Sequence, residues 1–221
     1  MKRLIYLTRH GQAGMLNGRT VCSGKLPDYS LNRNGREQAE QLALCMEGIP
    51  AQQVYCSTRK RSYETALIVS HNKQPVIQME DLDEIGMGTW EGMDFDEIKA
   101  RYPELYEARA ENHALQPPGG EAYDAAASRM QEMLQRILKE NDNQEAVVIS
   151  SHCGANRALL CSLLGIPFSE NRRIPQPYAC INVLEESDSG LRPLAVGMPF
   201  DALPDQREIT SMLDVFQVDR E

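Results

Sequence analysis

Two arginines and two histidines could meet in one pocket, and their types are suited to holding phosphate. They are Arg9, His10, Arg61 and His152. Each follows a short apolar run typical of a buried strand, and in an open α/β sheet the carboxyl ends of the strands share the edge where ligands bind. A guanidinium presents a fixed fork of donors to phosphate oxygens, and an imidazole adds another donor. The pattern therefore predicts a site for a phosphorylated small molecule.

Two glycines beside these side chains extend the same prediction. Gly11 directly follows His10, and Gly154 comes two residues after His152. Because glycine has no Cβ, the backbone at both places can approach a ligand closely and offer its N–H groups. Such donors would add to the positive field that a phosphate group requires on an acidic protein.

The elements that must position these residues follow from apolar periodicity. Strands are predicted at residues 2–8, 54–56, 75–79, 146–150, 180–184 and 191–196. Helices are predicted at residues 35–46, 59–71, 95–101, 104–110, 121–141 and 154–164. Strands that alternate with helices indicate an α/β fold, a three-layer α/β/α sandwich around a mostly parallel sheet. Without a repeat or a linker, residues 1–221 are expected to form one domain.

Length, composition and charge limit the class of protein. The chain has 221 residues, of which 42% are apolar and 25% charged, as in an average globular protein. Acidic residues number 32 against 23 basic ones, and the net charge of -9 makes nucleic acid and anionic lipid unexpected partners. No apolar run approaches the ~18 residues of a membrane span, and the charged start is unlike a signal peptide. The six cysteines show no zinc spacing. We therefore expect a soluble, cytoplasmic protein with no metal and no cofactor.

Five segments resemble, in the family order, sequence blocks of the histidine phosphatase superfamily, the phosphoglycerate-mutase-like proteins. They are LTRHGQ at 7–12, STRKRSYETA at 57–66, LDEIGMGTWEG at 82–92, PGGE at 118–121 and SHCG at 151–154. The resemblance covers the chain from residue 2 to about residue 184. An Arg-His-Gly triplet alone would be a weak signal, but five ordered blocks are specific.

The resemblance implies a mechanism. His10 is implied to be the nucleophile that becomes a phosphohistidine, and Glu84 the acid that protonates the leaving oxygen. Phosphoryl transfer depends mainly on positioning and on stabilising charge at the equatorial oxygens, which Arg9, Arg61 and His152 can do without a metal. Glu84 must carry a proton when substrate binds, and the incoming negative charge of the phosphate favours that form.

Eight residues are expected to contact the substrate. They are Arg9, Gly11, Gln12, Asn17, Ser57, Arg61, Cys153 and Gly154. Asn17 lies one residue beyond the position where the family often has asparagine. Cys153 stands where the family more often has glycine. It could be a redox-sensitive thiol beside a basic pocket, but a small residue offering its backbone N–H is the preferred interpretation.

Charged neighbours of these residues allow plainer interpretations. Arg59 and Lys60 are typical of a solvated helix start, although Arg59 could also reach a second anionic group of the substrate. Glu84 lies near Asp83 and two further acidic residues, any of which could be on the surface. Only its place before the Trp-Glu-Gly sequence at 90–92 singles it out.

The family resemblance leaves more than one function open. In the mutase branch the acidic block typically reads Glu-Arg-His-Tyr-Gly, whereas residues 83–92 resemble the phosphatase branch, which includes broad phosphomonoesterases and α-ribazole phosphatases. We therefore expect a phosphatase acting on a small phosphorylated metabolite. The alternatives are phosphotransfer of the phosphoglycerate mutase type and, less favoured because His10 and Glu84 are both present, a non-catalytic protein that binds a phosphorylated ligand.

Two segments outside the blocks carry further predictions. Residues 93–120 are predicted to form a small helical insertion over the site that selects the substrate. The insertion includes Tyr102, Tyr106, Arg109 and His113, of which His113 matches no family block and is expected to be structural or exposed. Residues 209–216 place apolar side chains on one helical face, which is expected to pack on the core or to join a dimer. A monomer and a homodimer both remain open.

Overall fold

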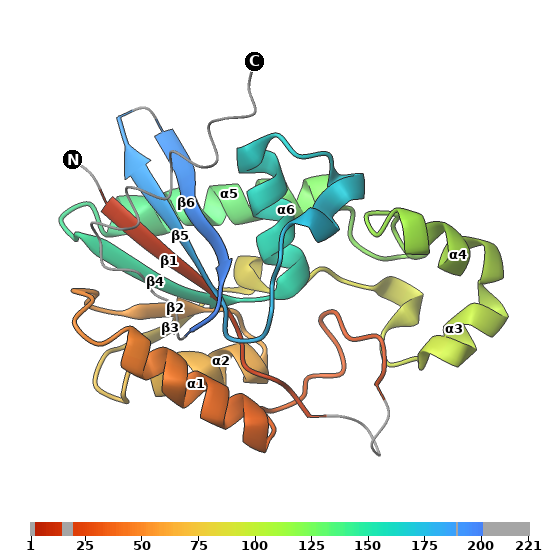
Figure 1. Cartoon of the computed structure of the whole chain (residues 1–221), viewed down its shortest axis with the longest axis horizontal. Coiled ribbons are helices and arrows are strands. Elements are labelled where there is room, and N and C mark those ends of the chain that lie inside the picture. The colour runs from red at the N-terminus through yellow and green to blue at the C-terminus, as the bar shows by residue number, and fades with distance from the viewer. Residues whose placement is uncertain (1–2, 15–19, 189, 201–221) are drawn as a thin grey trace.

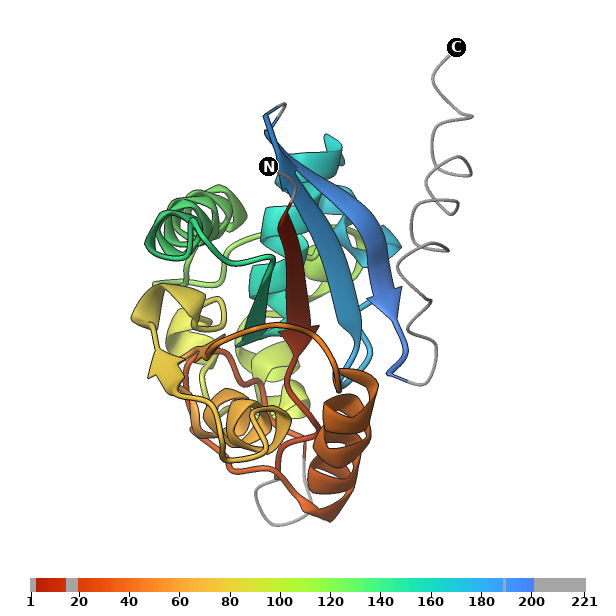
Figure 2. The same cartoon turned by 90° about the vertical axis from the view of Figure 1, so that its left-hand side faces the viewer.

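Six strands form one sheet in the computed structural model, which describes residues 3–14, 20–188 and 190–200. The order across the sheet is β3-β2-β4-β1-β5-β6. The strands are β1 (Arg3–Arg9), β2 (Val54–Cys56), β3 (Val76–Gln78), β4 (Ala146–Ser151), β5 (Ile181–Ser187) and β6 (Gly190–Met198). The first four pair in parallel, and β5 runs antiparallel to β1 and β6 on the side of β1 away from β4 (Figure 2). The prediction of a mostly parallel sheet is confirmed.

Helices cover both faces of this sheet, as predicted. They are α1 (Arg33–Cys45) and α2 (Lys60–Val69) on one face, and α5 (Tyr123–Glu140) and α6 (Cys153–Leu164) on the other (Figure 1). Side chains alternate along a strand, so Ile5 and Leu7 pack in the core under α5 and α6, while Tyr6 packs toward α1 and α2. Two apolar cores thus fix the strand ends that carry the site.

Local signals account for where the helices begin and end. The side chain of Asn32 caps α1 by accepting the N–H of Gly35 at 2.8 Å. Gly165 ends α6 with a φ of 67°, in the left-handed region that glycine adopts without strain. The second helix is shorter than predicted, because His71 and Asn72 take positive φ values of 50° and 53° and cannot continue it.

A small helical lobe lies beyond the carboxyl ends of the strands (Figure 1). It contains the helices α3 (Phe95–Arg101) and α4 (Pro103–Glu111), which confirms the predicted helical insertion. Trp90, Met93 and Ile98 form its own buried cluster. Three short 3₁₀ segments complete the fold, η1 (Glu80–Leu82), η2 (Gly88–Trp90) and η3 (Phe168–Arg173). The sequence did not predict them, because one or two turns are too short to show a periodicity.

Two sequence predictions concern segments outside the described residues. The amphipathic stretch 209–216 and the proposed phosphate ligand Asn17 both fall there. Among the described residues, no helix combines the length and the apolar character that crossing a membrane requires.

Candidate active site

The imidazole of His10 stands at the end of β1 with both ring nitrogens engaged. Nδ1 lies 2.7 Å from the carbonyl oxygen of Gly11, and Arg61 Nε donates to Nε2 over 3.2 Å. Because a carbonyl can only accept, the network assigns the proton to Nδ1 and the lone pair to Nε2. Burial, and then the charges of Arg61 and Arg9, lower the pKa of His10 well below its ordinary 6.5. His10 is therefore a neutral base at neutral pH, and its lone pair is on Nε2, where it accepts the hydrogen bond from Arg61.

His152 lies beside His10, with 5.0 Å between the ring centroids. Its Nε2 is 2.6 Å from Ser57 Oγ, which also accepts the N–H of Arg59. Ser57 Oγ and Nε2 therefore share one hydrogen bond, and Nδ1 of His152 has no partner among the described residues. Burial, and then the charge of Arg61, lower the pKa of His152 well below 6.5. His152 is therefore neutral at neutral pH, and its Nδ1 is unused by the described residues.

Two arginines flank this pair of imidazoles, and each has a buried nitrogen without a partner among the described residues. They are Arg9 Nε and Arg61 Nη1. The rest of each guanidinium is held: Arg9 lies 3.8 Å from the centre of the Tyr178 ring, and Arg61 Nη2 donates to the carbonyl of Gly24 over 2.7 Å. Leaving a buried donor unpaired is costly, so these nitrogens mark positions that the oxygens of an anion would complete.

The carboxyl group of Glu84 is fixed at the start of α6. Its Oε1 accepts the N–H groups of Ile85 and Ala155, both at 2.9 Å, and its Oε2 accepts that of Gly154 at 3.1 Å. A Cβ on Gly154 would lie 2.7 Å from Oε1, so a glycine there lets the carboxyl group approach the helix. The helix N-terminus supplies the donors that hold Glu84 in place.

Two adjoining cavities share Glu84 and Tyr178 in their walls. The smaller, of about 140 Å³, is also lined by Arg9, His10 and Arg61. The larger has a volume of about 580 Å³, in the range of small-molecule sites. Glu84 therefore stands between a cationic cavity of phosphate size and a larger one.

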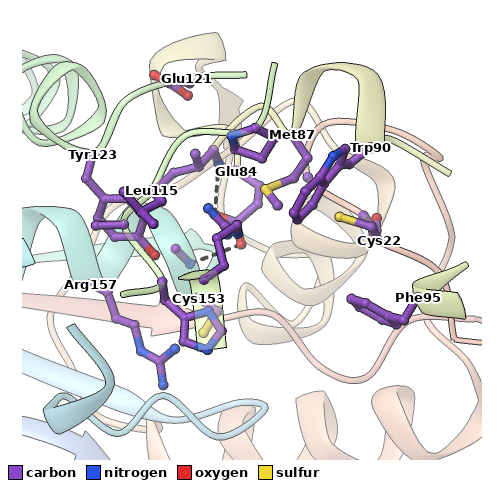
Figure 3. A pocket seen from close by; sticks show the side chains of 18 of the residues that line it. Cys22, Glu84, Met87, Trp90, Phe95, Leu115, Glu121, Tyr123, Cys153 and Arg157 are labelled. Atoms are coloured by element: carbon purple, nitrogen blue, oxygen red, sulfur yellow. Dashed lines mark hydrogen bonds between the residues drawn. The ribbon is translucent and has the colours of Figure 1, made fainter. Parts of the chain in front are cut away.

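The larger cavity is lined mostly by apolar and aromatic side chains. Figure 3 shows Trp90 and Phe95 on one side of Glu84, and Tyr123 and Arg157 on the other. The predicted insertion supplies part of the wall, through α3, α4 and the segment that follows them. Tyr106 and Arg109 of the insertion line it, and so does His113, which the sequence predicted to be structural or exposed. Tyr102 packs against Trp90 with 5.9 Å between ring centres.

Gly11 and Gly154 do not offer their N–H groups to a phosphate, contrary to what the sequence predicted. The N–H of Gly11 donates to Thr65 Oγ1 at 3.1 Å, and the N–H of Gly154 donates to Glu84. Neither N–H is free for a phosphate oxygen. A Cβ on Gly11 would lie 2.3 Å from the carbonyl oxygen of Gly35, so this glycine lets the loop after β1 pack on α1.

The other predicted substrate contacts, Gln12, Ser57 and Cys153, lie in different parts of the site. Gln12 lines the smaller cavity, and its backbone N–H donates to Gln38 Oε1 at 2.9 Å. Ser57 is buried behind His152 and acts on it rather than lining either cavity. Cys153 lines the larger cavity, and burial raises the pKa of its thiol. A raised pKa keeps the thiol protonated, which argues against the redox interpretation.

Arg59 is not the solvated side chain that the sequence suggested. Its Nε forms an ion pair with the fully buried Asp83 at 3.0 Å, and Asp83 also accepts the backbone N–H and the hydroxyl of Thr58. The guanidinium of Arg59 is therefore not free for a second anion of the substrate. Across the described residues, no group of three or more His, Cys, Asp or Glu side chains is placed to hold a metal ion.

Sequence reasoning overlooked the structural role of Glu91. Its carboxylate accepts four backbone N–H groups at 2.9–3.0 Å, those of Gly24, Lys25, Leu26 and Met87. This contact fixes the loop whose Gly24 carbonyl holds Arg61. Glu91 was part of a family block, but nothing local in the sequence shows that a loop more than 60 residues earlier folds onto it.

Comparison with known proteins found one matching family model and several similar phosphatases. A model described as the histidine phosphatase superfamily (branch 1) matches residues 5–198. The chain is 34% identical over 147 residues to phosphoserine phosphatase 1 of Hydrogenobacter thermophilus, covering 66% of this chain and 69% of that protein. It is 30% identical over 166 residues to the adenosylcobalamin/alpha-ribazole phosphatase of Escherichia coli, covering 74% and 80%.

A solved structure shows the same fold over nearly the whole described chain. Bacillus stearothermophilus YhfR superposes with a TM-score of 0.82 at 28% identity, covering 89% of this chain and 97% of that one. The chain also matches several 6-phosphofructo-2-kinase/fructose-2,6-bisphosphatase proteins, and it spans less than half of their length. The family resemblance and the fold class predicted from the sequence are both confirmed.

Proposed function

Since the chain belongs to the histidine phosphatase superfamily (branch 1) and is a phosphoric monoester hydrolase, we propose that it hydrolyses a small phosphomonoester through a phosphohistidine on His10. One observation carries this proposal. The neutral, buried His10 lies beside Arg61 and His152, and three buried nitrogens have no partner in the described chain, which are Arg9 Nε, Arg61 Nη1 and His152 Nδ1. A nucleophile lies where phosphate oxygens would be bound.

The first half of the reaction forms the phosphoenzyme. His10 Nε2 attacks phosphorus in line as the ester oxygen departs, and the protonated Glu84 carboxyl gives its proton to that oxygen. The imidazole gains positive charge, which the Nδ1–H contact to the Gly11 carbonyl stabilises. The guanidinium groups of Arg9 and Arg61 stabilise the charge on the equatorial oxygens, so the proposed chemistry needs no metal.

The second half returns the enzyme to its starting state. Glu84, now a carboxylate, takes a proton from a water molecule that attacks phosphorus from the side of the departed alcohol. The phosphorus–nitrogen bond breaks, the electron pair returns to His10 Nε2, and inorganic phosphate is released. Glu84 is suited to both steps because it lines the cavity of the phosphoryl group and the cavity of the leaving group.

The division into two cavities suggests how substrate is selected. The phosphoryl group would occupy the space of about 140 Å³, and the alcohol portion the space of about 580 Å³. We propose that residues 93–120 act as the specificity insertion of a single domain, because Phe95, Tyr106 and Leu115 line the larger space. Exchanging this insertion with that of a relative should change substrate preference while turnover of an aryl phosphate persists.

The decisive experiment measures phosphate release from an aryl phosphate in excess EDTA. The wild type should release phosphate and His10→Ala should not, whereas His71→Ala, which removes an exposed histidine, should match the wild type. Quenching the wild type with alkaline detergent should trap a phosphoenzyme that is stable to base and is lost on treatment with acid. Normal turnover by His10→Ala would refute the mechanism.

The same preparation separates the alternative functions. Transfer from phosphoglycerate without net phosphate release would indicate a mutase, and binding of phosphate without any turnover would indicate a non-catalytic protein. The cytoplasmic location, the lack of nucleic-acid and membrane partners, and the choice between monomer and homodimer stay predictions.

A further inference from the structure

Three arginines from three separate elements line the larger cavity. Arg109 comes from α4, Arg157 from α6 and Arg172 from η3. The other charged residues in its wall are Glu84 and Glu121. A concentration of positive charge is unexpected on a chain with a net charge of -9, and the proposed site for the transferred phosphate is already supplied by other arginines.

No carboxylate within the described residues forms an ion pair with these three arginines. Glu121 is paired with Arg129 at 2.6 Å, and Glu84 is held by backbone N–H groups. Arg157 uses Nε to donate to the carbonyl of Ile174 at 2.9 Å. None of the three arginines therefore has a counter-ion from the part of the chain that the structure describes, and Arg172 is an exposed residue at the edge of the cavity.

Arg109 is also held over an aromatic ring. Its guanidinium carbon lies 5.4 Å from the centre of the Trp90 ring, in the range of a cation–π contact. Burial lowers the pKa of Arg109, and the nearby charge of Arg172 contributes to the same shift. Two like charges are thus kept near each other, which is unfavourable until an anion binds between or beside them.

His113 lies near the same three arginines, and their charges affect its protonation. Its Nε2 is buried and has no hydrogen-bond partner among the described residues. Burial, and then the charges of Arg172, Arg109 and Arg157, lower its pKa to about 4. The imidazole is neutral at neutral pH, so it can add one hydrogen bond to a ligand without adding charge.

We propose that the substrate carries a second anionic group, a carboxylate or a phosphate, on its alcohol portion, and that Arg109 and Arg172 bind it in the larger cavity. This inference rests on the proposed function, because it assigns the cavity to the leaving group. It places the second anion at the insertion and η3, and not at Arg59, whose guanidinium is paired with Asp83.

The test compares three aryl phosphates that differ only at a para methylene group. One ends in a neutral acetamide, one in a carboxylate, and one in a phosphonate that resists hydrolysis and represents phosphate. The methylene keeps leaving-group acidity nearly constant. We expect kcat/KM to be higher by about tenfold for at least one anionic compound than for the acetamide, as one charged hydrogen-bonding contact would give. The better of the two anionic compounds identifies the chemistry of the second group.

The variants Arg109→Gln and Arg172→Gln should each lower the ratio of anionic to neutral kcat/KM by at least about threefold. Arg173→Gln is the matched control, because it removes the same charge from the same turn, where the exposed side chain pairs with Glu170. It should leave the ratio at the wild-type value.

The outcomes separate this inference from the proposed function. Hydrolysis of the acetamide with equal kcat/KM for all three compounds would overturn the second-anion inference and leave the phosphatase proposal standing. A ratio unchanged in both arginine variants would overturn it as well. Failure to hydrolyse any of the three, with an intact folded protein, would instead contradict the proposed function.

Discussion

The hydroxyl oxygen of Ser57 lies 2.6 Å from Nε2 of His152, so the direction of this hydrogen bond sets which nitrogen of the ring carries the proton. Ser57 Oγ also accepts the N–H of Arg59, and we expect it to donate its own proton to the imidazole. Nδ1–H of His152 is left as the donor for a phosphate oxygen. A serine buried behind the site thus sets the donor pattern of a histidine inside it.

Ser57→Ala should lower kcat with aryl phosphates by about tenfold, because a free ring can adopt the tautomer that turns a lone pair toward the phosphate. The pH profile should show an added ionisation from the less constrained His152. Ser70→Ala, which removes another buried serine outside both cavities, should leave kcat unchanged. A Ser57→Ala enzyme with wild-type kcat and pH profile would contradict the assigned tautomer.

Glu84→Gln should slow alkyl phosphates far more than aryl phosphates, since a good leaving group needs little protonation. The measurement is the slope of log kcat against leaving-group pKa, which should become steeper in the variant. Gly154→Ala should shift the slope the same way, because its Cβ would fall 2.7 Å from Glu84 Oε1. Equal losses on both substrate classes would argue against Glu84 as the proton donor.

Glu91→Gln should weaken turnover although Glu91 lies outside the smaller cavity. A glutamine has one oxygen that can accept, whereas both carboxylate oxygens of Glu91 accept N–H groups of the loop at 24–26, so some of these hydrogen bonds would be lost. The Gly24 carbonyl that accepts from Arg61 would then no longer be fixed. We expect kcat/KM to fall by about tenfold for every substrate, as for one misplaced charge-stabilising group. Glu37→Gln, at an exposed helical ion pair, is the control, and equal effects of the two changes would refute this role.

The stability of the fold should depend on pH through His10 and His152. Both are neutral when buried, with pKa values lowered well below 6.5, whereas the unfolded imidazoles bind protons near pH 6.5. The free energy of unfolding is therefore at its full value above pH 6.5, and it decreases as the pH falls below 6.5, because the unfolded chain then binds protons that the folded protein does not. Each histidine should contribute a slope approaching about 1.4 kcal/mol per pH unit.

Denaturant unfolding at pH 6.5, 6.0 and 5.5 measures this slope. In His10→Asn, the change of the unfolding free energy with pH should lose the part that His10 contributes. In His71→Asn, which changes an exposed position, it should equal that of the wild type. An unchanged slope in His10→Asn would mean that this imidazole already binds a proton in the folded state.

Glu84 and Asp83 show how much of the site the sequence alone could predict. Both belong to one acidic run, and the family block identified Glu84 as the residue to expect in the site. Charge alone allowed Asp83 to be exposed, yet it is buried and paired with Arg59. Neighbouring side chains on an irregular segment point in different directions, and local sequence does not encode which one meets a buried partner.

The sequence by itself determined the alternation of strands and helices, the caps at Asn32 and Gly165, and the strand ends that carry His10 and His152. These features depend on apolar periodicity and on backbone preferences that act over a few residues. Only the tertiary structure decided that Tyr178 covers Arg9, that Glu91 holds the loop at 24–26, and that three arginines meet in the larger cavity. Such contacts join residues far apart in the chain, and their energies depend on how whole elements pack rather than on any local pattern.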